Sequence, residues 1–260
     1  MSGIVERKVD RRSGSTWQQA DDRVVEEAPL EIRLEGTPLA VVMRTPGSDA
    51  DLILGFSLTE GILLGPHEVA GIEEIDDNRW NLRLADGVHV DPSRFQRNFY
   101  STSSCGVCGK ASIDAVRVSS GPLNPELRLS TAVLDGLSDS MRAKQVNFEE
   151  TGGIHAAAAV TAGGDLVALR EDVGRHNAVD KLVGALAPER WRFDDLVLFV
   201  SGRISFEVVQ KAAVAGFPVL CGISAASSLA VELGDELGMT VAGFVRGDGC
   251  TVYCGRHRII

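Results

Sequence analysis

The sequence predicts an α/β protein, built from a small α+β N-terminal unit and a larger α/β domain with a mixed sheet. In the second half of the chain, continuous apolar runs of strand length alternate with helical segments, which is typical of a parallel or mixed sheet covered by helices. In the first half, short alternating runs surround one helical segment. A chain of 260 residues, 44% of them hydrophobic, is large enough for one big core or two smaller ones.

The first half is expected to hold a tail and the small α+β domain. Residues 1–22 are polar and are predicted to be a flexible tail, and the small domain is expected to span residues 23–112. Apolar runs predict its strands at residues 30–34, 39–43, 72–75, 80–84 and 88–90. Between them, residues 51–64 carry apolar side chains at helical spacing, with Ser48 or Asp49 available as the N-cap.

The second half, residues 113–260, is expected to form the α/β domain. An amphipathic helix is predicted over residues 130–145, with Ser130 as its N-cap. Strands are then predicted at residues 196–200, 218–220 and 240–245, separated by helices at residues 205–215 and 225–237. Each of these strands ends in small polar residues, and ligands of open α/β sheets bind at the carboxyl ends of strands. The turns that follow the three strands therefore form one candidate site.

Two cysteines, Cys105 and Cys108, lie three residues apart in a stretch of Ser and Gly. Small neighbours favour a mobile backbone that a partner can approach, and Lys110 supplies a positive charge that favours thiolate over thiol. We therefore expect reactive sulfur here. A structural zinc site would need two further ligands, and the other cysteines form no second C-x-x-C. Dithiol exchange of the thioredoxin type ranks below sulfur carriage, because residues 96–104 are polar and barely strand-like.

The composition excludes several classes of function. A formal net charge of -10 argues against a general nucleic-acid binder, so an anionic ligand would have to meet a local basic cluster. Five cysteines, an odd number in a long chain, do not indicate a disulfide framework, and an exposed thiol pair suits the reducing cytosol. The N-terminus lacks the apolar core of a secretory signal, and no stretch reaches the roughly 18 apolar residues of a membrane span. We expect a cytoplasmic protein that binds neither nucleic acid nor membranes.

Two polar clusters precede the predicted sheet. In the first, His155 follows a glycine turn and opens a segment of small residues. In the second, residues 171–181 place many polar side chains at a strand-to-helix junction. The structural interpretation of the second cluster is a solvated helix start, with Asp172 or Asn177 as the cap and with Asp180 and Lys181 on the solvent face. The functional interpretation of both clusters is favoured by the presence of the thiol pair and the strand-end turns in the same chain.

Five ordered motifs together resemble the FdhD family, the formate dehydrogenase accessory sulfurtransferases. They are S-S-C-G-V-C-G-K, T-G-G-I-H-A-A, E-D-V-G-R-H-N-A-V-D-K, S-G-R-I-S-F-E and G-F-V-R-G. The resemblance covers nearly the whole chain from about residue 24. It implies a cytoplasmic homodimer whose C-terminal domain is cytidine-deaminase-like. It also implies that the protein takes persulfide sulfur from a cysteine desulfurase and delivers it to the bis-molybdopterin guanine dinucleotide cofactor of a molybdenum or tungsten formate dehydrogenase.

The resemblance also implies roles for individual residues. Cys105 would carry the persulfide and Cys108 would be an auxiliary thiol. The residues expected to contact the cofactor, which is a bound substrate rather than a permanent group, are Phe244, Val245, Arg246, Gly247, Asp248 and Gly249. From the strand-end argument alone we add Arg203 and Arg175 as cations for its phosphates. No metal site is expected, and the partners would be the desulfurase, the formate dehydrogenase catalytic subunit and the guanine nucleotide part of the cofactor.

Two alternatives from other classes remain. Zinc nucleobase deaminases combine H-x-E with a later P-C-x-x-C, and the Glu acts as general acid and base. Here the C-x-x-C comes first, and His155 is followed by two alanines, so the carboxylate that shuttles the proton is missing. The second alternative is a non-catalytic chaperone that binds the finished cofactor, with the thiols incidental. The strand-end turns would suit that function equally well.

Overall fold

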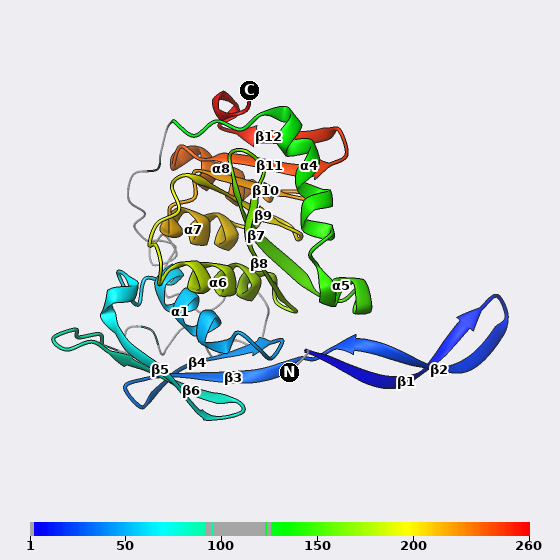
Figure 1. The fold of residues 1–260 in the computed structure, drawn as a ribbon, viewed down its shortest axis with the longest axis horizontal. Coiled ribbons are helices and arrows are strands. Elements are labelled where there is room, and N and C mark those ends of the chain that lie inside the picture. The colour runs from blue at the N-terminus through cyan, green and yellow to red at the C-terminus, as the bar shows by residue number, and fades with distance from the viewer. Residues whose placement is uncertain (1–2, 92–94, 96–122, 124–125) are drawn as a thin grey trace.

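The computed structural model describes residues 3–91, 95, 123 and 126–260, and it contains three sheets. A six-stranded sheet with helices on both faces forms one half of the molecule, and a four-stranded sheet closes the other half (Figure 1). A two-stranded hairpin projects to one side of this body (Figure 1). The predicted mixed α/β character is therefore confirmed, whereas the likeness to cytidine deaminases and the predicted domain boundaries stay predictions. Cys105, Cys108 and Lys110 lie outside the described residues.

The elements follow one another in this order along the chain. The strands are β1 Ile4–Ser13, β2 Thr16–Val25, β3 Ala28–Leu34, β4 Thr37–Arg44, β5 Val69–Asp76, β6 Arg79–Leu84, β7 His155–Thr161, β8 Leu166–Asp172, β9 Leu196–Val200, β10 Val219–Gly222, β11 Thr240–Arg246 and β12 Gly249–Cys254. The helices are α1 Asp49–Thr59, α4 Thr131–Arg142, α5 Val146–Thr151, α6 Arg175–Leu186, α7 Phe206–Ala215 and α8 Ser228–Glu236, with short 3-10 turns at Pro66–Glu68 and Arg256–Arg258.

The six-stranded sheet has the order β12-β11-β10-β9-β7-β8. Strands β9, β10 and β11 are parallel, while β7, β8 and β12 run antiparallel to their neighbours. Helix α4 packs on one face, and α6, α7 and α8 cover the other (Figure 1). Alternate residues of β7 serve the two faces, since Ala157 and Ala159 join the α6 side and Ala156 and Ala158 join the α4 side. Burial on both faces explains why β9 is apolar throughout.

The N-terminal unit shares its core with the second half of the chain. Its sheet has the order β4-β3-β6-β5, and it packs on α1, which in turn crosses α6. The two helices touch through glycine: a Cβ at Gly55 would lie 1.8 Å from the carbonyl oxygen of Asp180, and one at Gly184 would lie 1.8 Å from that of Asp51. One apolar cluster therefore runs from the four-stranded sheet through α1 and α6 to the six-stranded sheet.

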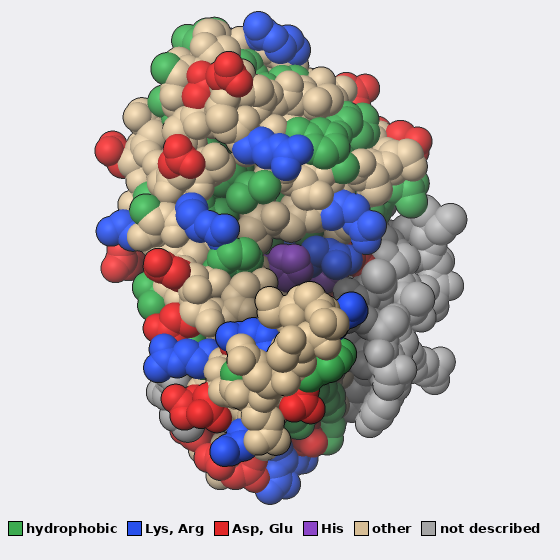
Figure 2. Space-filling view, turned by 90° about the vertical axis from the view of Figure 1, so that its right-hand side faces the viewer, with side chains coloured by type: hydrophobic (Ala, Val, Ile, Leu, Met, Phe, Trp, Pro, Cys, Tyr) green, Lys and Arg blue, Asp and Glu red, His purple; other side chains and the backbone are tan. Residues whose placement is uncertain are grey.

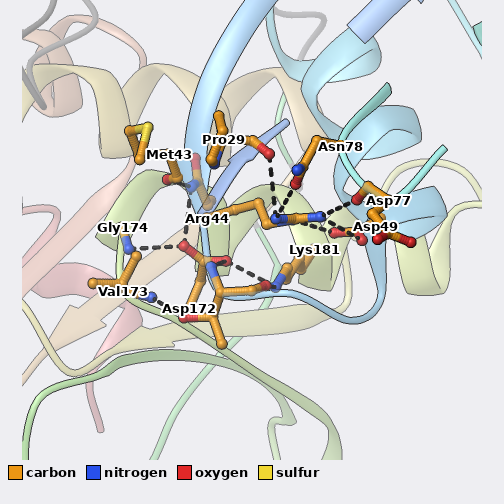
Figure 3. Close-up of polar contacts among 12 residues, drawn as sticks. Pro29, Met43, Arg44, Asp49, Asp77, Asn78, Asp172, Val173, Gly174 and Lys181 are labelled. Atoms are coloured by element: carbon orange, nitrogen blue, oxygen red, sulfur yellow. Dashed lines mark hydrogen bonds and ion pairs between the residues drawn. The ribbon is translucent and has the colours of Figure 1, made fainter. Parts of the chain in front are cut away.

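Each half of the chain has a buried ion pair near their junction, and hydrogen bonds to Thr45 connect the two halves (Figure 3). Asp172 forms a 2.8 Å ion pair with Lys181, whose ammonium also donates to the carbonyl of Thr45 at 2.7 Å. Arg44, on β4, pairs with Asp49 at the start of α1 at 2.9 Å. The expected solvent position of Lys181 is therefore wrong: only 2% of it is exposed, because Asp172 on β8 matches its charge and Thr45 of the N-terminal unit accepts its hydrogen bond.

Asp180 is likewise buried, although the sequence places it on the solvent face of the helix start. It lies 2.9 Å from the ammonium of Lys211 on α7, and Lys211 also pairs with Glu60 at 2.7 Å. Burial opposes the charge of Lys211, but the neighbouring carboxylates of Asp180 and Glu60 outweigh it and raise the pKa of Lys211. Thr59 donates to Asp180 at 2.7 Å and completes this network.

Several expected elements differ from those found. Residues 1–22, expected as a flexible tail, lie mostly in the β1–β2 hairpin, whose strands are exposed on both faces and so lack apolar alternation. Residues 88–90 form no strand. The helix expected over residues 130–145 ends at Arg142, and α5 follows as a separate helix. Ser130 caps α4 as predicted, since its hydroxyl accepts from the backbone N–H of Val133 at 3.3 Å.

Candidate functional site

The carboxyl ends of β9, β10 and β11 meet at one edge of the six-stranded sheet because these strands are parallel. Strand β7 is antiparallel to β9, so its first residue, His155, reaches the same edge. Two hydrogen bonds fix this junction: the Ser201 N–H donates to the carbonyl of Ala156 at 2.9 Å, and the Ala156 N–H donates to the Ser201 hydroxyl at 2.9 Å. The start of β7 and the turn after β9 therefore meet at this edge of the sheet.

The charged cluster after β8 joins the same edge. Asp172, the last residue of β8, is the strand partner of His155, and Arg175 is the first residue of α6. Gly202 lies between His155 and Arg175, because a Cβ at Gly202 would be 3.2 Å from His155 Nδ1 and 3.6 Å from Arg175 Cβ. Asp172 Oδ1 accepts from the Gly174 N–H at 2.8 Å, so it supports the turn before the helix rather than capping the helix directly.

His176 on α6, Glu207 on α7 and Ser205 just before α7 form a polar cluster next to this edge. His176 Nε2 lies 2.9 Å from Glu207 Oε2 and 3.2 Å from the Ser205 hydroxyl. Burial opposes ionisation of Glu207, yet the hydrogen bond and charge of His176 lower the pKa of Glu207. Burial, together with the charges of Arg175 and His176, lowers the pKa of His155, so His155 is a neutral imidazole at physiological pH.

Two buried polar atoms near this edge have no hydrogen-bond partner among the described residues: Nε of Arg175 and Oε1 of Glu207. Buried polar atoms are normally paired, so such atoms point to a group that binds here. The face that carries α4, α5 and the hairpin shows a histidine side chain among Lys and Arg side chains (Figure 2).

A cavity of about 610 Å³ opens on the α4 side of the same edge, and we call it the α4–α5 cavity. His155 lies at its rim, and its other linings include Asp139, Arg142, Gln145, Phe148, Ser201 and Ile223. The guanidinium carbon of Arg142 lies 4.1 Å from the centre of the Phe148 ring. The sequence alone did not indicate the contribution of α4 and α5, because their side chains reach the edge only through the packing of α4 on the sheet.

The residues expected to contact the cofactor span the end of β11, the turn at Gly247 and Asp248, and the first residue of β12. The Phe244 N–H donates to the carbonyl of Ser224 at 3.1 Å, which ties this turn to the one after β10. Phe244 has a φ of 54°, which lies in the left-handed region. The pairing of β11 with β12 is irregular at this residue. The residue is 40% exposed. Arg246 lies with its guanidinium carbon 6.0 Å from the Phe244 ring. Gly247 has a φ of 57°, and glycine adopts this conformation most easily.

The predicted residues of this turn are not equivalent. Arg246, Gly247, Asp248 and Gly249 are exposed, whereas the Val245 side chain is buried in the core on the α4 side and can offer only its backbone to a ligand. In the described part of the chain, no ion pair joins Arg246 to Asp248 or to any other carboxylate. Its charge is thus open to a ligand.

The two added arginines lie on the same edge but not beside this turn. Arg203 is exposed in the turn after β9, and Arg175 starts α6. Strands β9 and β11 are separated by β10, which puts their ends about 10 Å apart. Arg203 and Arg246 therefore lie at two separate points of this edge.

The cysteines that the structure describes differ in their environment. Burial raises the pKa of Cys221, and burial likewise raises that of Cys254, so both thiols are protonated and shielded. Cys250 is exposed. The C-x-x-C pair, Cys105 and Cys108, lies outside the described residues.

Two features are absent from the described residues. Across residues 3–91 and 126–260, no group of three His, Cys, Asp or Glu side chains could hold a metal ion. In the same ranges, no helix is long and apolar enough to cross a membrane.

Comparison with known proteins agrees with the resemblance. The model of the FdhD/NarQ family matches residues 25–260. The chain is 49% identical to the sulfur carrier protein FdhD of Streptomyces avermitilis, over 97% of this chain and 94% of that protein. It is 42% identical to the sulfur carrier protein FdhD of Sulfolobus acidocaldarius, over 97% of each chain. The crystal structure of a putative formate dehydrogenase accessory protein from Desulfotalea psychrophila shares the fold, with a TM-score of 0.81, 21% identity and 99% of each chain covered.

Proposed function

Because the chain belongs to the FdhD/NarQ family, we propose that it is a sulfur carrier for the maturation of formate dehydrogenase. In this proposal Cys105 accepts persulfide sulfur from a cysteine desulfurase and passes it to the bis-molybdopterin guanine dinucleotide cofactor, which is bound as a substrate. The relatives named above as sulfur carrier proteins support the sulfur chemistry. The accessory protein from Desulfotalea psychrophila, which shares the fold, supports the link to formate dehydrogenase.

The sulfur step is a thiolate exchange. The thiolate of Cys105 attacks the terminal sulfur of the desulfurase persulfide, a new S–S bond forms on Cys105, and the desulfurase cysteine leaves as a thiolate. The outer sulfur then passes as sulfur(0) to the reduced cofactor, which supplies the two electrons that turn it into a sulfide ligand, and Cys105 leaves as the thiolate. Small neighbours and the charge of Lys110 in the sequence favour an accessible, ionised thiol at Cys105. Cys108 is proposed as the auxiliary thiol.

The observation that carries cofactor binding is the convergence of several sequence motifs at one sheet edge. His155, Arg175, the turn after β9 and the turn after β11 all lie there, although they are far apart in the sequence. Arg203 and Arg246 supply exposed positive charge at two points of this edge in a chain with a net charge of -10. We propose that these cations bind the phosphates of the cofactor.

The sulfur step is tested by replacing Cys105. We expect Cys105→Ala to fold normally but to gain no sulfur after incubation with a desulfurase and cysteine, as read by mass spectrometry, and to leave formate dehydrogenase immature in cells. Cys250→Ala is the matched control, because Cys250 is the exposed cysteine of the described residues. Normal maturation with Cys105→Ala would contradict sulfur carriage and would favour the non-catalytic chaperone.

The cofactor step is tested with GDP, which represents the nucleotide half of the cofactor. If Arg246 makes a charge-assisted hydrogen bond to a phosphate, Arg246→Ala should cost about 1.5–3 kcal/mol of binding free energy, or about a tenfold to hundredfold loss of affinity. Calorimetry measures this loss, and Arg83→Ala on β6, in the other sheet, is the control. Equal affinities for wild type and Arg246→Ala, or no binding to either, would remove Arg246 from the site.

The remaining parts of the proposal concern partners and location. We propose that the cysteine desulfurase and the formate dehydrogenase catalytic subunit are the protein partners, that the chain works in the cytoplasm and that it forms a homodimer. A zinc deaminase activity is not favoured, because His155 is hydrogen-bonded into the strand edge and is followed by Ala156 and Ala157, so no carboxylate follows it in the required position.

A further inference from the structure

We infer that Thr45, which follows β4 in the N-terminal unit, is a positioning residue for Arg175 at the start of α6. Thr45 belongs to none of the five sequence motifs and lies far before Arg175 in the sequence. The inference rests on the proposed function, because Arg175 is one of the cations expected to meet the phosphates of the cofactor substrate. It adds a residue that acts through Arg175 and does not itself touch the ligand.

The three polar groups of Thr45 all bond to the segment that leads into α6. The Thr45 hydroxyl accepts from the backbone N–H of Val173 at 3.1 Å. The Thr45 N–H donates to Asp172 Oδ2 at 3.1 Å, and its carbonyl accepts from the Lys181 ammonium at 2.7 Å. Thr45 is only 2% exposed, so water does not compete for these bonds. Thr45 therefore holds the end of β8, the turn after it and the first half of α6 together.

The carboxylate of Asp172 completes the hold on this turn (Figure 3). Its Oδ1 accepts from the Gly174 N–H at 2.8 Å and from the side-chain amide of Asn177 at 2.9 Å. Its Oδ2 accepts from Thr45 and lies 2.8 Å from the ammonium of Lys181. All four hydrogen-bonding positions of the carboxylate are thus used, and Asp172 is fully buried. Asp172 and Thr45 form one rigid support for the turn.

This support fixes the direction in which α6 begins. The N–H groups of Val173 and Gly174 are both bonded to it, so the backbone of the turn faces the N-terminal unit. Gly174 has no room for a side chain, because a Cβ there would lie 2.8 Å from Asn177 Nδ2. Arg175, the next residue, lies against Gly202 at the carboxyl edge of the sheet, since a Cβ at Gly202 would be 3.6 Å from Arg175 Cβ. Contacts on one side of the turn thus set the position of Arg175 on the other side.

The guanidinium of Arg175 depends on this position. Its Nε is buried and has no hydrogen-bond partner among the described residues, so it is available to a ligand at the edge. The guanidinium donates in a fixed fork, and its bonds to a phosphate require the right direction of approach. Without the Thr45 hydroxyl, the N–H of Val173 loses its acceptor, which is unfavourable, and a movement of the turn towards water relieves it. Such a movement carries Arg175 with it.

The test compares Thr45→Val with Thr45→Ser. Valine has nearly the shape of threonine but lacks the hydroxyl, whereas serine keeps the hydroxyl. GDP is titrated into the full-length protein by calorimetry. We expect Thr45→Val to weaken GDP binding by about twofold to tenfold, which is the range that one hydrogen bond contributes, and we expect Thr45→Ser to bind GDP like the wild type.

Thr59→Val is the matched control for a purely structural effect. Thr59 is also fully buried, and its hydroxyl donates to Asp180 at 2.7 Å in the network between α1, α6 and α7. Thr59→Val should lower the melting temperature, as Thr45→Val does, and should leave GDP affinity unchanged. Thr45→Val is also combined with Arg175→Ala. Because Thr45 acts through Arg175, Thr45→Val should cause no further loss of affinity in that background.

Several results would overturn the inference. They are equal GDP affinities of wild type and Thr45→Val, equal losses with Thr45→Val and Thr45→Ser, and an undiminished effect of Thr45→Val in the Arg175→Ala background. A loss of affinity with Thr59→Val as large as that with Thr45→Val would also do so, because it would show that reduced stability is sufficient. The absence of GDP binding to the wild type would remove the ligand that Arg175 is positioned for and would overturn the inference as well.

Failure of the proposed function gives a different result. Persulfide formation on Cys105 is measured by mass spectrometry without any nucleotide, and Thr45→Val should gain sulfur like the wild type. If the wild type forms the persulfide but Thr45→Val binds GDP normally, only the positioning inference is wrong. If the wild type gains no sulfur and Thr45→Val weakens GDP binding as expected, the proposed sulfur transfer is wrong and the positioning inference stands.

Discussion

The crossing of α1 and α6 provides a quantitative test of the structure. Gly55 and Gly184 lie in helix interiors, where replacing glycine by alanine normally stabilises a protein by about 0.5–1 kcal/mol. Here the added methyl has no room, because a Cβ at Gly55 would lie 1.8 Å from the carbonyl oxygen of Asp180. We therefore expect Gly55→Ala to be destabilising, against its helix propensity.

The size of the effect follows from the geometry. Ordinary contacts of a Cβ begin near 3.4 Å, so the helix backbones would have to part by about 1.6 Å. A radial gap of about 0.5–1 Å already removes about a quarter to a half of the dispersion attraction of the facing atoms. Overpacking of this kind costs about 1–3 kcal/mol or more, which exceeds the gain in helix propensity. We expect a net loss of about 2 kcal/mol for Gly55→Ala and a similar loss for Gly184→Ala.

The matched control is Gly136→Ala on α4. Gly136 is exposed in a helix interior, and a Cβ there would meet nothing within 4 Å. This substitution should raise the free energy of unfolding by about 0.5–1 kcal/mol. Guanidinium denaturation measures all three variants, with the slope checked for two-state behaviour. If Gly55→Ala is as stable as wild type, or if Gly136→Ala is as destabilising as Gly55→Ala, the close contact of α1 with α6 is wrong.

Further predictions concern the buried charges and the thiols. Lys211→Met leaves the buried carboxylate of Asp180 without its cation and should lower the free energy of unfolding by about 3–5 kcal/mol, measured by denaturation, with part of the loss recovered in the double variant with Asp180→Asn. The pKa of Glu207 is lowered from 4.5 by His176, so the stability that its charge provides is present above pH 4.5 and is lost as the pH falls through the lower value in the folded protein. Glu207→Gln should therefore flatten the acid limb of a stability-versus-pH curve, and an unchanged limb would contradict the His176 contact. Under native conditions, a thiol reagent should modify Cys250 but neither of the buried cysteines, as peptide mass spectrometry would show.

Elements buried on both faces were predictable from the sequence. The strand predicted at residues 196–200 matches β9. The helix predicted at residues 205–215 matches α7, for which Ser205 occupies the N-cap position. A short, continuous apolar run is typical of a strand buried on both faces, because every side chain enters the core. The β1–β2 hairpin was not predictable, because charged and polar side chains fill both of its faces and the period-2 signal is absent.

Burial of charge could not be predicted either. Asp180 and Lys181 are adjacent in the sequence and look like a solvated helix face. In the structure each is held by a different distant group, Lys211 for Asp180 and Asp172 for Lys181. A charge enters the core only when its partner is already there, and partners that lie on other elements leave no local signal.

By itself the sequence determined the α/β class, the strand-end turns, the C-x-x-C pair and the resemblance to a sulfurtransferase family, because each of these depends on residues close together in the chain. The tertiary structure decided that His155, Arg175 and the turn after β9 share one edge, since the antiparallel pairing of β7 with β9 and β8 brings them there. It also decided that Gln145 and Asp139 line a cavity on that edge. These contacts form only when α4 packs on the finished sheet, so no local pattern in the sequence could encode them.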